Sequence, residues 1–140
     1  MADTKVEEMS TPRQTLGRWG EEQAAAYLTS KGYEIVARNS RTPYGEIDLI
    51  AYQPNSQSEC DETLDTTIVF IEVKTRATKT FGFPEESITS RKREHMLAAA
   101  QSYLQDHPDL VGCWRIDVIA VQRYSPKGQV VFKHFENVIT

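Results

Sequence analysis

The chain of 140 residues has only two cysteines and no long apolar run. Cys60 and Cys113 match neither a disulfide framework nor a zinc-binding pattern, so we expect two free thiols. No apolar stretch approaches the roughly 18 residues that a membrane span needs. Residues 1–10 also lack the apolar centre of a secretory signal. The sequence therefore predicts neither a disulfide scaffold nor a membrane protein, and we expect a cytoplasmic location.

Positive charge is also scarce, because 16 lysines and arginines stand against 20 acidic residues, for a net charge of −4. Such a balance argues mildly against nucleic-acid binding. The acidic excess, however, is concentrated in residues 1–10 and 53–66, which leaves the remainder of the chain net positive. Residues 74–95 are rich in lysine and arginine. The charge distribution therefore does not exclude a nucleic-acid partner.

The chain shows no internal repeat, and we expect a flexible tail over residues 1–10 and one domain over 11–140, with a flexible acidic loop at 53–66. Apolar periodicity, start signals and β-branched runs predict two helices and five strands. The helices are expected at 12–31 and 90–105, and the strands at 33–37, 45–52, 67–74, 114–121 and 130–135. This order, α-β-β-β-α-β-β, predicts an α/β fold with a mixed central sheet flanked by helices.

Two carboxylates and a lysine are expected to meet on neighbouring strands. Alternate side chains of a strand share a face, so Asp48 lies with Glu46 and Ile50, and Glu72 lies with Lys74. If the two strands pair, Asp48 and Glu72 meet with Lys74 beside them. Such carboxylates repel one another unless a cation neutralises them, and Mg²⁺ takes oxygen ligands of this kind. The pattern suits phosphodiester hydrolysis, although a solvated surface pair explains the same spacing.

Glu21 strengthens the first of these interpretations. It falls on or beside the apolar stripe of the first helix, where a carboxylate is costly unless it is paired or bound to a metal. Gly17 and Gly20, near it, would let the helix approach the sheet closely. The alternative is a position at the edge of the stripe, with Arg18 or Arg41 as the ion-pair partner.

Further residues are candidates for supporting or phosphate-binding roles. Glu46 shares the face of Asp48. It is a further metal ligand, a group that supports the ligands, or simply an exposed residue at the start of the strand. Four cationic side chains lie near the site in the sequence, and each is either a phosphate contact or a solvated charge. They are Arg41, in a turn before the second strand, and Arg76, Lys79 and Lys92, which follow Glu72. Lys92 is the favoured phosphate contact. A cation in the first turn of a helix is unfavourable because it opposes the helix dipole, and binding of a phosphate would explain its presence there.

Asp117 and the histidines are expected to have no direct part in the chemistry. Asp117 alternates with apolar neighbours and so lies opposite the apolar face, where it either contacts Arg115 or supports the site, and the structural contact is favoured. The histidines, His134 among them, have no metal-binding spacing and are expected to be surface or rim residues.

Four strings of the sequence, in this order, resemble the YraN family of small bacterial proteins. They are GRWGEEQAAAYL, NSRTPYGEIDLIA, IVFIEVKTR and WRIDVIAV, and the resemblance covers residues 13–121. It implies a restriction-endonuclease-like fold similar to that of Holliday-junction resolvases, with a site of the PD-(D/E)xK type. Asp48 matches the first acidic residue of that site, Glu72 the second and Lys74 the lysine, while Glu21 matches a glutamate of the first helix. Ile47 stands where the motif has proline, a departure that is usual for divergent sites of this type.

The resemblance and the residues together predict an endonuclease-like protein that uses Mg²⁺, or Mn²⁺ in its place, to hydrolyse DNA. Asp48, Glu72 and Glu21 are the expected metal ligands. Similarity to resolvases implies branched or structured DNA as substrate and a homodimer, because two strands must be cut symmetrically. One alternative is an accessory protein that binds nucleic acid without cutting it, and another is a protein-interaction domain, which the net acidity favours.

Overall fold

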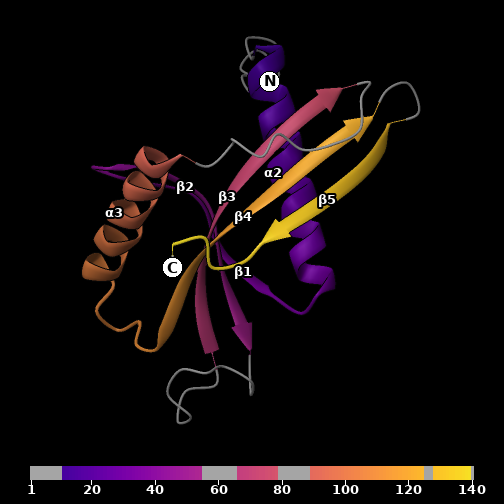
Figure 1. The fold of residues 1–140 in the computed structure, drawn as a ribbon. Helices are drawn as coiled ribbons and strands as arrows, with labels where there is room; N and C mark the ends of the chain where they lie inside the picture. Colours follow the sequence, from indigo (N-terminus) through magenta and orange to yellow (C-terminus); the bar gives the residue numbers. More distant parts are fainter. Residues whose placement is uncertain (1–10, 55–65, 79–88, 125–127, 140) are drawn as a thin grey trace, which may run out of the picture.

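The predicted order of elements, α-β-β-β-α-β-β, is confirmed. The structure is a computed structural model that describes residues 11–54, 66–78, 89–124 and 128–139 (Figure 1). Its elements are α2 (Pro12–Ser30), β1 (Glu34–Thr42), β2 (Gly45–Pro54), β3 (Thr66–Thr78), α3 (Ser90–Asp106), β4 (Cys113–Tyr124) and β5 (Gln129–Phe135). Within the described residues no helix is long and apolar enough to cross a membrane.

The five strands form one mixed sheet in the order β1-β2-β3-β4-β5. The first three strands are an antiparallel meander, as predicted. Strand β4 then runs parallel to β3, and β5 returns antiparallel to β4. A parallel neighbour requires a crossover connection, which is usually helical; α3 lies in the segment that connects β3 to β4.

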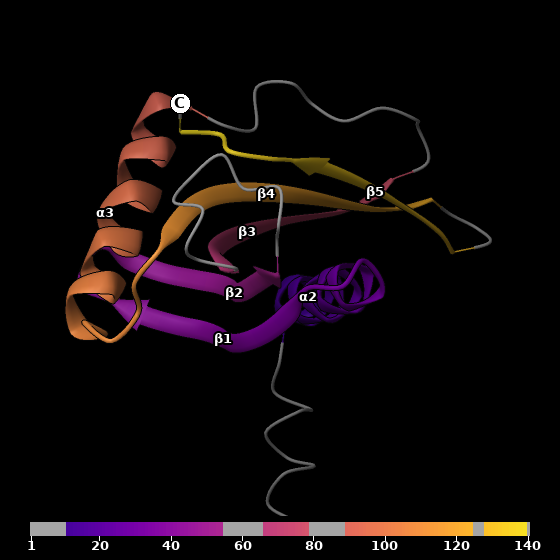
Figure 2. The same ribbon diagram turned by 90° about the horizontal axis from the view of Figure 1, so that it is seen from below.

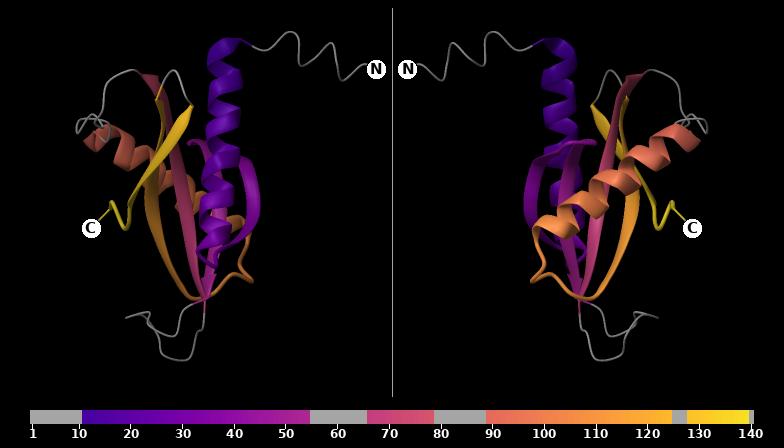
Figure 3. Two further views of the ribbon diagram at one scale, coloured as in Figure 1. Left: turned by 90° about the vertical axis from the view of Figure 1, so that its right-hand side faces the viewer. Right: turned by 90° about the vertical axis from the view of Figure 1, so that its left-hand side faces the viewer.

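The two helices cover opposite faces of the twisted sheet (Figures 2 and 3). On one face, Ala24, Ala25 and Leu28 of α2 pack against a cluster that includes Leu49 and Ile71. On the other face, α3 packs against a second cluster, made mainly by Ile47, Ile50, Ile68, Phe70 and Ile116. The apolar stripe of each helix thus explains its place, since burying that stripe is the main force that holds a helix on a sheet.

Helix α2 approaches β3 closely at one glycine. It begins with a capping box between Thr11 and Gln14. A Cβ atom added at Gly20 would lie 1.9 Å from the Thr75 hydroxyl oxygen, whereas one added at Gly17 would meet nothing within 4 Å. The expected close approach is therefore made by Gly20, and Gly17 has no part in it. The neighbouring residue, Glu21, is held next to the sheet as a result.

Three local predictions were wrong. Strand β1 extends to Thr42, so Arg41 lies in a strand and not in a turn. Residues 53, 54 and 66, predicted as parts of the acidic loop, belong to β2 and β3, and residues 55–65 lie outside the described residues. Cys113 is disulfide-bonded and not a free thiol, while Cys60 also lies outside the described residues.

Candidate active site

Asp48 lies at the point where strands β2 and β3 stop pairing. The last backbone pair of the two strands in this direction is Leu49 with Ile71, so Asp48 and Glu72 are the next residues on each strand. The Val73 backbone N–H donates to Asp48 Oδ2 at 2.8 Å. A side chain thus accepts the hydrogen bond where strand pairing has ended. This bond fixes the Asp48 carboxylate beside the strand segment that carries Glu72 and Lys74.

The expected alternation of side chains is interrupted along β2. Ile47 and Ile50 both pack in the cluster under α3, whereas Leu49 packs under α2. Ile47 is therefore not on the same face as Leu49, where strict alternation placed it. Asp48 lies close enough to Glu72 on β3 and Glu21 on α2 for their negative charges to raise its pKa.

Two lysines surround the Glu72 carboxylate. Lys92 Nζ, from α3, lies 2.7 Å from Glu72 Oε1, and Lys74 Nζ lies 3.8 Å from the same oxygen. Burial and the adjacent ammonium of Lys92 lower the pKa of Lys74. Burial acts in the same direction on Lys92, but its bond to Glu72 outweighs burial and raises the pKa of Lys92. The structure therefore adds Lys92, predicted only as a phosphate contact, to the group around Glu72.

Asp48 is strongly perturbed by its surroundings. Burial raises the pKa of its carboxyl from 3.8 to about 7; repulsion from Glu72, Glu21 and Glu46 adds to the rise, and the hydrogen bond from Val73 opposes it. Burial and repulsion from Glu46 also raise the pKa of Glu21. A cluster of carboxylates that is both buried and self-repelling is typical of functional sites, because a bound cation relieves both costs.

Glu21 and Glu46 are linked to each other through a strand residue. With its side-chain nitrogen turned toward them, Asn39 donates to Glu21 Oε1 at 3.1 Å and to Glu46 Oε1 at 2.9 Å. Asn39 adopts a left-handed conformation, with φ of 51°, which asparagine tolerates better than most residues. The pattern along the sequence did not predict this bridge, because Asn39 belongs to a strand whose length was underestimated.

Two carboxylate side chains, rather than the three predicted, are placed so that they fit Mg²⁺ as ligands. Among the described residues, no three Asp, Glu, His or Cys side chains are grouped as a complete metal-binding set. Asp48 and Glu72 are nevertheless adjacent carboxylates, and Mg²⁺ commonly takes one or two carboxylates with waters and phosphate oxygens as its other ligands. Glu21, expected as a third ligand, is instead tied to Glu46 by Asn39.

The predicted phosphate contacts are divided. Lys92 lies in the site, and Arg76 is exposed on β3. Arg41 is almost fully exposed and lies 3.9 Å from a Glu46 carboxylate oxygen. Lys79 falls outside the described residues. Among the predicted phosphate contacts that the structure describes, Lys92 alone forms an ion pair with one of the carboxylates that we expect to hold a metal.

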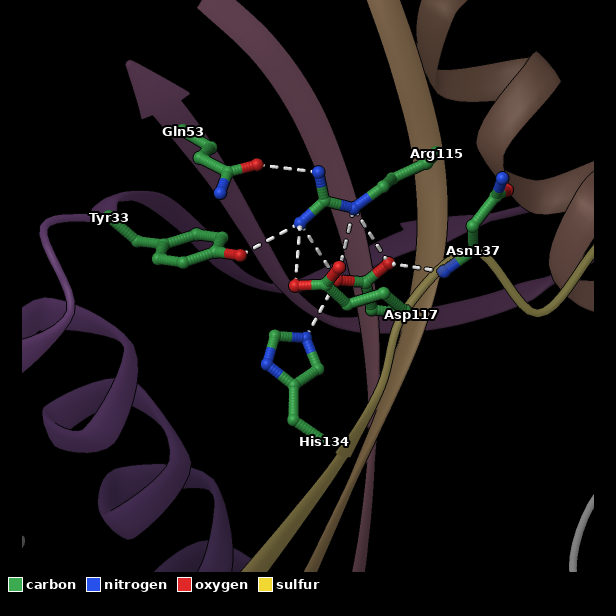
Figure 4. A network of polar contacts seen from close by, with 7 residues as sticks. Tyr33, Gln53, Arg115, Asp117, His134 and Asn137 are labelled. Atoms are coloured by element: carbon green, nitrogen blue, oxygen red, sulfur yellow. Dashed lines mark hydrogen bonds and ion pairs between the residues drawn. The ribbon is translucent and has the colours of Figure 1, made fainter. Parts of the chain in front are cut away.

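A second polar network, of which the sequence predicted only the pairing of Asp117 with Arg115, lies under α2 (Figure 4). Asp117 is fully buried. Its carboxylate accepts from Arg115 Nε at 3.0 Å and the Asn137 backbone N–H at 2.9 Å, and lies 2.7 Å from His134 Nε2. Arg115 also donates to the Tyr33 hydroxyl at 2.7 Å.

The surface or rim position predicted for His134 was wrong, because its side chain is only 8% exposed, whereas the predicted pairing of Asp117 with Arg115 is confirmed. Asp117 lies on the face of β4 opposite Ile116, as alternation predicts, but α2 covers this face and Asp117 is fully buried. Burial raises the pKa of Asp117, but the bonds from His134 and Arg115 outweigh it and lower that pKa. Since buried ionised groups of this kind need partners, the network is a structural element.

The raised pKa of Asp48 predicts how stability depends on pH. The carboxyl titrates near 3.8 when unperturbed and near 7 in the folded protein, so between these values the folded state holds a proton that the unfolded chain has lost. The free energy of unfolding should fall as pH rises through this window, by roughly 4 kcal/mol. Asp48→Asn keeps an acceptor for Val73 and should lose most of this slope, with a smaller slope left from Glu21. Urea unfolding at a series of pH values measures the effect. If the free energy of unfolding has the same slope with pH in the variant and the parent, the prediction is contradicted.

The mixed sheet, covered by one helix on each face in the order α-β-β-β-α-β-β, defines an α/β protein, and this order agrees with a restriction-endonuclease-like fold. The chain belongs to the family described as uncharacterised protein family UPF0102, the YraN family, whose family model matches residues 20–121. The resemblance seen in the sequence is thus confirmed.

Three relatives show how far the similarity extends. A UPF0102 protein of Syntrophomonas wolfei is 44% identical over 115 residues, covering 82% of this chain and 90% of the relative. One from Desulfosudis oleivorans is 42% identical over 128 residues, covering 91% and 95%. One from Herpetosiphon aurantiacus is 37% identical over 134 residues, covering 93% and 98%. The names of these relatives state no activity, so the function has to be argued from the site.

Proposed function

We propose that this protein is a Mg²⁺-dependent nuclease that hydrolyses phosphodiester bonds in DNA, with branched or structured DNA as its substrate and Mn²⁺ as a substitute ion. The observation that supports this most directly is the buried carboxylate of Asp48, with a pKa raised to about 7, next to Glu72 and two lysines. The burial of Asp48 and its repulsion from Glu72, Glu21 and Glu46 are costly to the folded state unless a cation binds there. The proposal includes action in the cytoplasm.

Asp48 and Glu72 are the residues that would hold the ion. When bound, Mg²⁺ polarises a phosphoryl oxygen and lowers the pKa of a bound water. The Val73 N–H keeps the Asp48 carboxylate in place, so this group needs little reorganisation. Lys74 supplies a positive charge for the negative charge that develops on the attacked phosphate. Glu21 and Glu46, joined by Asn39, add negative potential that attracts a divalent cation.

A second candidate function is that of a nucleic-acid-binding accessory protein that does not cut. The contact that favours it is Lys92 with Glu72 at 2.7 Å, because this ammonium neutralises one of the two carboxylates without any metal. The buried and poorly neutralised Asp48 argues for the nuclease, since a binding protein gains nothing from that cost.

The two candidates are separated by a cleavage assay. Purified protein would be incubated with linear, nicked, flap and four-way DNA of one sequence, in Mg²⁺, in Mn²⁺ and in EDTA. The nuclease proposal predicts cleavage of at least one structured substrate that stops in EDTA. Binding of these DNAs with no cleavage in either metal would favour the accessory protein. Sedimentation with four-way DNA would test the proposed homodimer, which should bind as two copies per junction.

Lys92→Ala should separate metal binding from DNA binding. The variant loses the ammonium that competes for Glu72, so Mn²⁺ affinity should rise by up to about tenfold, whereas affinity for DNA should fall because a phosphate contact is lost. Calorimetric Mn²⁺ titration and fluorescence anisotropy with labelled DNA measure the two effects. Arg93→Ala is a matched control, because Arg93 is an exposed cation one residue further along α3. Unchanged Mn²⁺ affinity in Lys92→Ala would contradict the claim that Lys92 and the metal ion compete for the Glu72 carboxylate.

A further inference from the structure

A cavity of about 320 Å³ lies between α3 and strands β2 and β3, directly beside the carboxylates. Its volume falls at the lower end of the range of about 300–1,000 Å³ for small-molecule sites. One part of its wall is apolar and belongs to the cluster under α3; that part consists of Ile47, Phe70, Met96, Ala99 and Ile116. The cavity is therefore suited to a flat, largely apolar group.

The rest of the wall is charged and includes the proposed active site. Asp48 and Glu72 line the cavity together with Arg91, Lys92 and His95 of α3. A ligand that fills this space thus meets an apolar surface at one end, and carboxylates and cations at the other. A nucleotide has this combination of groups, since its base is flat and its phosphate is an anion that lysine, arginine and a carboxylate-bound divalent ion can bind.

Tyr44 also lines the cavity, and it is one of the most exposed large hydrophobic residues in the part of the chain that the structure describes, with 58% of the residue exposed. It is held by the two-residue turn between β1 and β2, in which Thr42 pairs with Gly45. The Thr42 hydroxyl donates to the Gly45 carbonyl at 2.7 Å and accepts from the Tyr44 backbone N–H at 3.1 Å. Gly45 has a φ of 132°, which favours glycine strongly. The turn therefore fixes the backbone of Tyr44 beside the cavity, and the exposed ring is accessible for a base to stack on it.

We propose that this cavity binds the base of a single unpaired nucleotide, with its phosphate at Asp48 and Glu72. This inference rests on the proposed function and names its substrate class. A cavity of this volume is large enough for one base. A paired base would have to leave the duplex to enter, and that cost is smallest where the base is already unpaired. The substrate is then a flap, a loop or single-stranded DNA, in preference to intact duplex.

The inference is tested by binding measured without cleavage. Fluorescence anisotropy would compare a labelled 12-nucleotide single strand with a blunt duplex of the same length, using the full chain in Ca²⁺. The single strand should bind about tenfold more tightly than the duplex, and Tyr44→Ala should weaken its binding about tenfold, since stacking on an aromatic side chain contributes that much. Tyr44→Phe should retain the affinity. Val111→Ala, at another exposed apolar residue that does not line the cavity, should leave it unchanged.

Each outcome decides one of the two proposals. Equal binding of both DNAs, with no effect of Tyr44→Ala, overturns the assignment of the cavity. Preference for the single strand that depends on Tyr44 supports the assignment, even if no DNA is cut in Mg²⁺ or Mn²⁺, in which case the nuclease proposal fails. Cleavage of intact duplex as fast as of a flap supports the nuclease and overturns the cavity assignment.

Discussion

Asp48→Asn and Glu72→Gln should each lower the rate of metal-dependent DNA cleavage by about 10²–10³-fold or more. Each substitution removes one of two adjacent carboxylates that would hold the ion, and replaces a charge with a neutral amide of nearly the same shape. Asparagine at position 48 can still accept the hydrogen bond from Val73, so the separation of β2 and β3 should stay as it is. The loss should therefore be in catalysis and not in folding.

The control for these variants is Glu34→Gln. Glu34 is an exposed carboxylate on strand β1, and the same change of charge there should leave the rate unchanged. Rates would be measured with the structured substrate that the parent protein cuts best, and folding would be followed by thermal unfolding. Cleavage by Asp48→Asn at the rate of the parent would contradict the assignment of this residue.

Asp117→Ala should lower the free energy of unfolding by about 3–5 kcal/mol. The variant leaves the Arg115 guanidinium, whose side chain is only 16% exposed, without its closest counter-charge. It also removes the acceptor for the Asn137 N–H and the partner of His134. Loss of one partner from a buried charged network is far more costly than loss of a surface ion pair, because the charges left behind stay buried. Urea unfolding at pH 7 measures the change.

Glu136→Ala is the matched control for this prediction. Glu136 also lies near Arg115, with a carboxylate oxygen 3.8 Å from Nη2, but its side chain is 60% exposed. Its removal should change the free energy of unfolding by less than about 1 kcal/mol. Similar losses for the two variants would show that burial of Asp117 does not determine its contribution.

The order of elements was predictable because it depends on local patterns. β-Branched residues in Thr67–Lys74 predicted the central strand β3, and the proline after Thr11 marked the start of α2. The pairing of β2 with β3 followed from their closeness in the chain. The acidic residues and the lysine were then found from their spacing and from the family resemblance.

The details of the site were not predictable because they depend on contacts between distant segments. The bond from Val73 to Asp48 forms where the pairing of the two strands ends, and strict alternation misplaced Ile47. The contact of Lys92 with Glu72 depends on how the crossover helix lies over the sheet. The burial of Asp117 depends on His134, seventeen residues further along the chain. No periodicity carries such information.

The central claim is that Asp48 and Glu72 together hold a divalent cation, and calorimetric titration of the metal-free protein tests it most directly. Mn²⁺ would be added at pH 8, above the raised pKa of Asp48, to the parent protein, Glu72→Gln and Glu34→Gln. We predict saturable binding to the parent and to Glu34→Gln, with affinity at least about tenfold weaker in Glu72→Gln. Equal affinity in all three proteins would contradict the account.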